Sequence, residues 1–175
     1  DAPRRPGILV AGPSGVEALD KAPLLPGDVA LDSISYDTAG EVILAGRGVD
    51  DAFVRVYLDN RPLTTSRISG GDWRVQLPEV DTGTYTLRVD QVDANGAVMA
   101  RVESPFLRED RAVLEQLALG NGPVSEITVQ PGHSLWAISE DRYGNGIEYV
   151  KIFRANRDRI RDPDLIYPGQ IFDLP

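Results

Sequence analysis

The chain has 175 residues, a length that suggests one or two domains. Its 42% hydrophobic and 26% charged residues are typical of a globular protein and argue against general disorder. With no cysteine and one histidine, the composition excludes disulfides, cysteine nucleophiles and metal sites built from thiolates or several imidazoles. A net charge of −9 argues against nucleic acid and anionic membrane surfaces as partners. No apolar run approaches the ~20 residues that a membrane span needs, so no membrane insertion is expected within this chain.

Residues 1–28 are rich in proline, glycine and alanine. Apolar residues at 8–10 and 16–19 flank the turn-forming segment 12–15, which predicts either a short hairpin or a loosely packed linker. The chain starts without a methionine or a signal-peptide pattern, so we expect an export signal or anchor upstream of Asp1.

From residue 29 the sequence alternates between apolar and polar residues in short runs, for example at 54–58, 73–77 and 85–89. This period of two places apolar side chains on one face of a sheet. Turn-forming residues separate the runs, and Asn95-Gly96 is a strong hairpin signal because both residues tolerate positive φ. About seven strands with this spacing predict an antiparallel sandwich, with Trp73 in its core.

Three turn motifs in this segment follow one another in a familiar order: GDWRVQLP at 71–78, GTYTL at 83–87 and DANG at 93–96. Together they resemble the bacterial immunoglobulin-like repeats of cell-envelope proteins over residues 29–107. The resemblance implies an all-β sandwich without a disulfide that serves as a spacer or as a docking module for envelope proteins. Tyr85, at the start of a late strand, is expected to form a tyrosine corner by bonding back to a nearby turn.

Residues 108–125 are predicted to connect two domains. Val113, Leu114 and Leu117 have helical spacing, which predicts a short helix, with a partly disordered linker as the alternative. The segment GNGP at 120–123 predicts a flexible joint crossed by few contacts.

The C-terminal segment, residues 126–175, reads as strand, helix, helix, strand. A strand at 126–130 is followed by a helix that Ser134 caps and that ends near residues 142–144. A second helix is expected at 147–155 and a last strand at 170–174, with the two strands paired antiparallel. The basic run at 151–161 is interleaved with aspartates and predicts a solvated helix face.

This segment closely resembles the LysM domain over residues 127–175. The motifs that carry the resemblance are TVQPG at 128–132, SLWAI at 134–138, RYG at 142–144, AN at 155–156, IYPGQ at 166–170 and LP at 174–175. The resemblance implies a small α+β (βααβ) fold that binds the N-acetylglucosamine-containing backbone of peptidoglycan or chitin. The expected architecture is therefore an immunoglobulin-like sandwich followed by a LysM domain.

The family's ligand groove lies between the loop after the first strand and the loop before the last. Backbone groups in such turns can pair with N-acetyl amides, and apolar side chains can cover sugar faces. Ser134 could instead serve only as a cap, and Leu135 and Ile166 could belong partly to the core. Carried onto this chain, the candidate glycan-binding residues are Gly132, His133, Ser134, Leu135, Pro163, Asp164, Leu165, Ile166 and Tyr167.

His133 stands where the family usually has aspartate, which puts ligand affinity and choice in question. A histidine at the groove edge would change charge near pH ~6.5, so we expect binding to differ between about pH 5.5 and pH 8. As a catalytic base it lacks an evident orienting carboxylate, so an exposed loop histidine is favoured. For Trp136, helix packing is favoured over stacking on a sugar.

The expected function is non-catalytic binding of peptidoglycan in the periplasm or cell envelope, with no catalytic residue, metal or cofactor. Two alternatives remain open. The chain could be the binding part of a cell-wall hydrolase whose catalytic domain lies upstream. It could also be a cytoplasmic cation sensor, because some single-LysM bacterial proteins bind a cation instead of glycan.

Overall fold

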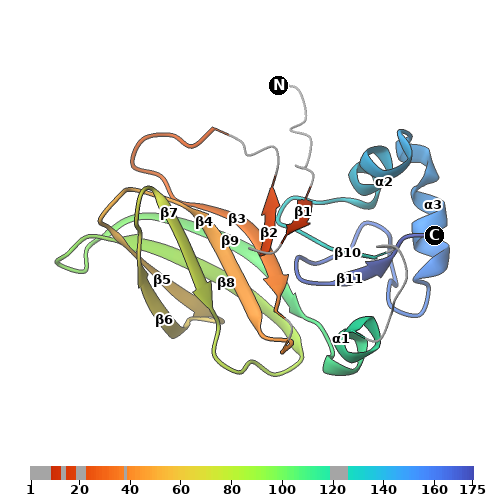
Figure 1. Cartoon of the computed structure of the whole chain (residues 1–175), viewed down its shortest axis with the longest axis horizontal. Coiled ribbons are helices and arrows are strands. Elements are labelled where there is room, and N and C mark those ends of the chain that lie inside the picture. Colours follow the sequence, from red (N-terminus) through yellow and green to blue (C-terminus); the bar gives the residue numbers. More distant parts are fainter. Residues whose placement is uncertain (1–8, 13–14, 19–22, 38, 119–125) are drawn as a thin grey trace.

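In the computed structural model, which describes residues 9–12, 15–18, 23–37, 39–118 and 126–175, a β-rich part is followed by a smaller α+β part (Figure 1). Near the N-terminus, β1 (Leu9–Gly12) and β2 (Gly15–Ala18) pair antiparallel as a hairpin. The two residues at its tip and the GNGP segment lie outside the described residues. We call residues 23–110 the β-region and residues 126–175 the C-terminal region.

The β-region consists of a three-stranded sheet in the order β3-β4-β7 and a four-stranded sheet in the order β6-β5-β8-β9. All neighbouring strands within both sheets are antiparallel, as the alternating sequence pattern predicts. The strands are β3 (Ala30–Tyr36), β4 (Val42–Arg47), β5 (Phe53–Leu58), β6 (Arg61–Arg67), β7 (Asp72–Gln76), β8 (Gly83–Val92) and β9 (Val98–Arg108).

The two sheets share one hydrophobic core. Leu44 and Val75 from the three-stranded sheet and Val56 and Leu87 from the four-stranded sheet belong to the same buried cluster. The period-two pattern explains this packing, because alternate residues of each strand point to the same face. Trp73 is 3% exposed within this cluster, which confirms the prediction that it is a core residue.

Two turns of the β-region form as the sequence predicts. The hydroxyl of Tyr85 donates a hydrogen bond of 2.7 Å to the carbonyl of Asp81, which confirms the expected bond back to a nearby turn. Between β8 and β9, the Asp93 amide donates to the Ala97 carbonyl at 3.0 Å, and Gly96 has a φ of +83°. The Asn95-Gly96 pair therefore lies in a tight turn between two antiparallel strands.

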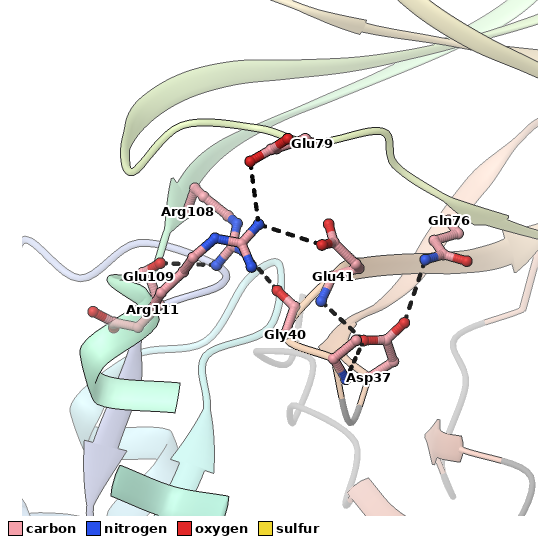
Figure 2. Close-up of polar contacts among 9 residues, drawn as sticks. Asp37, Gly40, Glu41, Gln76, Glu79, Arg108, Glu109 and Arg111 are labelled. Atoms are coloured by element: carbon pink, nitrogen blue, oxygen red, sulfur yellow. Dashed lines mark hydrogen bonds and ion pairs between the residues drawn. The ribbon is translucent and has the colours of Figure 1, made fainter. Parts of the chain in front are cut away.

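Helix α1 (Arg111–Ala118) follows β9 almost directly. The side chain of Asp110 accepts a hydrogen bond from the Ala112 amide at 2.9 Å and so caps the start of the helix. Arg111 reaches from the first turn toward Glu41 at 3.3 Å and Glu79 at 4.0 Å (Figure 2). The helix therefore starts against the loops of the β-region. None of the helices in the described ranges is long and apolar enough to cross a bilayer.

The C-terminal region has the strand, helix, helix, strand order that the sequence predicts. Its elements are β10 (Glu126–Thr128), α2 (Leu135–Tyr143), the 3-10 turn η1 (Gly146–Glu148), α3 (Tyr149–Ala155) and β11 (Ile171–Asp173). The strands β10 and β11 pair antiparallel, as expected. The segment predicted as one second helix is divided, because Asn145 caps the 3-10 turn before α3 begins.

The core of the C-terminal region is small and apolar. Its buried members lie in α2, α3 and β11 and in the segments that follow β10, α3 and β11. They are Val129, Leu135, Ile138, Ile152, Ile160, Phe172 and Leu174. Ser134 caps α2 as predicted, because its side chain accepts a hydrogen bond from the Ala137 amide at 3.1 Å.

Asn156 is a buried polar tie between α3 and β11. Its amide nitrogen donates to the carbonyls of Ile152 at 2.7 Å and Asp173 at 2.9 Å, and its amide oxygen accepts from the Asp173 amide at 2.9 Å. The side chain is completely buried. Removing it would take these partners from the amide and carbonyl of Asp173 in a buried part of the region, while the Ile152 carbonyl would keep its bond from the Asn156 backbone amide.

We predict that Asn156→Ala lowers the free energy of unfolding of the C-terminal region by roughly 2–4 kcal/mol, because several buried hydrogen bonds are lost together. Chemical denaturation followed by circular dichroism measures the change. Asn145→Ala is the matched control, because Asn145 caps an exposed turn with one bond to the Ile147 amide and should cost about 1 kcal/mol. Equal losses in the two variants would contradict the assigned role of Asn156.

Candidate functional site

The two loops predicted to frame a glycan groove leave the same end of the β10–β11 sheet. Beyond the strands, the Val129 amide donates to the Gln170 carbonyl at 2.7 Å, and the Gly169 amide donates to the Val129 carbonyl at 2.8 Å. The first loop (residues 132–135) starts just after this pair of bonds, and the second loop (residues 163–167) ends just before it. Leu135 and Ile166 both pack against the same core. The structure therefore brings the two loops together.

The candidate residues differ in how accessible they are. Gly132, Ser134 and Asp164 are exposed, and Leu165 is 60% exposed although its side chain is apolar. The half-buried members are His133, Pro163, Ile166 and Tyr167. Leu135 is 2% exposed, so its side chain belongs to the core and presents nothing to a ligand.

Local hydrogen bonds set the shape of the second loop. The Asp162 carboxylate accepts from the Asp164 amide at 2.9 Å, and the Asp162 carbonyl accepts from the Leu165 amide at 2.9 Å. These bonds form a turn that leaves the Leu165 side chain facing solvent. An exposed leucine on a fixed turn is suited to covering an apolar sugar face or an acetyl methyl group.

His133 is held in its neutral form. Its Nδ1 accepts a hydrogen bond of 3.2 Å from the Gln130 amide, and its own amide donates to the Gln130 carbonyl at 3.0 Å. Burial lowers the pKa of His133 to about 4. The expectation that this residue changes charge near pH ~6.5 is therefore wrong, since the folded chain keeps it neutral from about pH 5.5 upward. Its titration gives no reason for glycan binding to differ between about pH 5.5 and pH 8.

Trp136 packs against helical neighbours in the C-terminal region. Gly146 lies directly against the indole, and a Cβ at that position would overlap the ring. The ring centroid is 6.5 Å from that of Tyr149. The expected packing against helical neighbours is present, yet Trp136 remains 50% exposed.

Arg159 departs from the solvated face predicted for the basic run. Its guanidinium donates to the Ile171 carbonyl at 2.9 Å and pairs with the Asp173 carboxylate at 2.8 Å. It therefore ties the end of α3 to β11. In contrast, Lys151, Arg154 and Arg157 are exposed, as the interleaved charges predict.

Gln130 makes a contact with the β-region that the sequence does not reveal. Its side-chain oxygen accepts from the Ile34 amide at 2.7 Å, and its side-chain nitrogen donates to the Ile34 carbonyl at 2.7 Å. The pair of bonds resembles one rung of an antiparallel ladder on the outer edge of β3. Gln130 is 4% exposed, so this contact is buried.

Tyr36 and Glu109 form a second contact between the two regions, which is partly buried. The Tyr36 hydroxyl donates to the Gly169 carbonyl at 2.9 Å and accepts from the Glu109 amide at 2.9 Å. The Glu109 carboxylate accepts from the Ile171 amide at 2.9 Å, and the Leu107 amide donates to the Pro168 carbonyl at 2.8 Å. The expectation that few contacts cross between the two parts of the chain is therefore wrong.

Arg108 lies beside this contact and binds the backbone next to it. It is 1% exposed, and its guanidinium donates to the carbonyls of Gly40 at 2.6 Å and Glu109 at 2.8 Å (Figure 2). Its central carbon lies 5.1 Å from the centroid of the Tyr36 ring. Burial raises the pKa of Tyr36 to about 12, so the phenol keeps the proton that it donates to Gly169.

No local pattern marks these residues in the sequence. Tyr36 ends an ordinary strand, and Gln130 reads as one residue of a domain motif. Their partners are distant in the chain, since Gln130 and Ile34 are separated by 96 residues. Only evolutionary coupling between such positions could signal the contact before a structure is known.

The low pKa of His133 predicts a measurable pH dependence of stability. The unfolded chain binds this proton with a pKa of about 6.5. The contribution of the neutral His133 to the free energy of unfolding is therefore fully present above that pH and is lost as pH falls toward about 4. We expect the wild type to lose roughly 2 kcal/mol more than His133→Asn between about pH 7 and pH 4.5. Denaturation curves at several pH values measure this difference. Parallel curves for the two proteins would show that the fold does not hold His133 neutral.

Comparison with known proteins places a family on the C-terminal region. The LysM domain model matches residues 127–175. The potassium binding protein Kbp of Escherichia coli O6:H1 is 50% identical over 48 residues, which cover 27% of this chain and 32% of that protein. An uncharacterized protein of Deinococcus radiodurans is also 50% identical over 48 residues, which cover 27% of this chain and 18% of that protein. The matches thus span a third or less of these curated relatives. The chain contains a C-terminal LysM domain, and an all-β region of two antiparallel sheets precedes it.

Proposed function

We propose that the chain binds the N-acetylglucosamine-containing glycan of peptidoglycan, without catalysis, in the periplasm or cell envelope. The observation that carries the proposal is the LysM domain with both of its groove loops accessible at one end of the small sheet. The exposed positions of these loops offer backbone groups at Gly132 and an apolar side chain at Leu165, which suit N-acetyl amides and sugar faces.

A site of this size is expected to bind weakly. A few exposed residues on two turns bury little sugar surface against the entropic cost of association. Firm attachment to a polymer would then come from several domains along one glycan or from a second anchor in the intact protein. The proposal therefore predicts low affinity for short oligomers and stronger retention on purified cell walls.

For the β-region we propose an immunoglobulin-like sandwich that acts as a spacer or docks an envelope protein. Two observations support this part. Strands β4 and β5 follow one another in the chain but lie in different sheets of three and four strands, an exchange typical of Greek-key sandwiches. The Tyr85 hydroxyl bonds back to Asp81, as in a tyrosine corner.

Cation binding is the second candidate function. It is favoured by the 50% identity to a protein whose name states that it binds potassium. That match covers 32% of the relative, so most of the relative lies outside the matched segment. Under this candidate the chain would be a cytoplasmic sensor, and the loops of the LysM domain would bind no sugar.

The two candidates are separated by NMR titrations of the full chain. The N-acetylglucosamine pentamer is added in one series, and potassium chloride with sodium chloride as its reference is added in another. We expect saturable shifts at residues 132–135 and 163–167 with the pentamer. Saturable shifts with potassium, but none with the pentamer, would favour cation binding over glycan binding.

Leu165→Ala tests the groove more sharply. We expect it to weaken pentamer binding by roughly 3- to 10-fold, because an apolar contact with the sugar is lost. Ile147→Ala is the matched control, since Ile147 is 65% exposed on the same domain and lies in η1, outside both loops. Both variants should unfold like the wild type. Equal affinities for the two variants would exclude Leu165 from the site.

A further inference from the structure

The β-region contacts the LysM domain at the residues that flank both groove loops. Gln130 lies two residues before the first loop, and Pro168 and Gly169 directly follow the second loop. Gln130 pairs with the edge of β3, while Pro168 and Gly169 accept hydrogen bonds from Leu107 and Tyr36. The contact surface therefore includes the residues at which both loops join the rest of the domain.

The geometry of Gly169 shows how close this approach is. Its φ of +92° is a conformation that residues with a Cβ rarely adopt. A Cβ at this position would also overlap the Leu107 carbonyl and the Phe106 ring. The backbone that ends the second loop thus lies directly on β9, and only glycine allows it.

Each of these contacts is at least partly buried and is made to backbone groups. Gln130 satisfies both the amide and the carbonyl of Ile34, and the Tyr36 hydroxyl serves Gly169 and Glu109 at once. Moving either loop flank would leave such groups unpaired unless water replaced the lost partner. The free LysM domain would therefore sample loop positions that the docked domain does not.

We infer that the β-region sets the affinity of the LysM site for glycan by holding both of its loops in place, with Tyr36 and Gln130 as the positioning residues. The inference rests on the proposed glycan binding. It adds that the affinity for glycan is regulated by a part of the chain that does not contact the sugar. A ligand that meets preformed loops does not pay the entropy of ordering them. Undocking would lower affinity without removing any sugar contact.

The coupling between docking and glycan binding must be reciprocal. Glycan bound to ordered loops should in turn stabilise the docked arrangement. Amide hydrogen exchange reports this directly at Ile34 and Ile171, whose amides donate across the contact to Gln130 and Glu109. Both amides should exchange more slowly when the pentamer is bound.

The test uses the full chain and compares Tyr36→Phe with Tyr85→Phe. Each variant removes one hydroxyl that donates to a backbone carbonyl of the folded chain, Gly169 for Tyr36 and Asp81 for Tyr85. Only the first of these bonds crosses to the LysM domain. Glu109→Gln is a second variant, because an amide has one oxygen to serve the Ile171 and Asp110 amides, which both bind the Glu109 carboxylate.

We expect Tyr36→Phe and Glu109→Gln to raise the Kd for the N-acetylglucosamine pentamer by about 3- to 10-fold and to accelerate exchange at Ile171. Tyr85→Phe should leave the Kd within about twofold of the wild type. If Tyr36→Phe does not fold by circular dichroism, Glu109→Gln decides the question.

Two results would overturn the inference while glycan binding stands: a wild-type Kd in Tyr36→Phe and Glu109→Gln, or an equal loss in Tyr85→Phe. Failure of the wild type to bind the pentamer would instead remove the proposed function, and this inference with it.

Discussion

The half-buried hydroxyl of Tyr36 is one of the groups that join the two regions of this chain. The Tyr36 hydroxyl donates to a carbonyl of the LysM domain and accepts from an amide at the end of β9. Glu109, whose amide it holds, uses its carboxylate to bind the amide of Ile171 at the start of β11. This short chain of bonds therefore helps to fix the position of β11 relative to β9.

One buried cation lies beside this phenol. Arg108 is buried beside it without a carboxylate partner among the residues that the structure describes, and two backbone carbonyls accept its hydrogen bonds. A buried guanidinium is costly unless its donors are satisfied, and the Nε of Arg108 has no hydrogen-bond partner in the described part of the chain. The bond to the Gly40 carbonyl links Arg108 to the loop before β4. The ion pairs of Arg111 with Glu41 and Glu79 lie nearer the surface, where such pairs contribute little. The rigidity of the structure around Tyr36 and Arg108 therefore comes from their hydrogen bonds to backbone groups.

Sequence patterns predict the parts of this structure that are local. Period-two alternation gives the strands, Ser134 gives a helix start, and the ordered motifs of residues 127–175 give the LysM domain. The missed features depend on long-range packing. The neutral state of His133 follows from a burial that the sequence pattern does not show, and Arg159 binds β11 instead of facing solvent. Ile34 and Gln130 meet only because both regions are folded.

Residual dipolar couplings of backbone amides in the full chain test most directly whether the β-region and the LysM domain form one unit. The couplings depend on how each part is oriented, so each region yields its own alignment tensor. The buried contacts through Tyr36, Gln130 and Glu109 predict that one tensor fits the couplings of both regions together. Two tensors of clearly different magnitude would show that the regions reorient independently, and would contradict a LysM domain whose loops are held by the β-region.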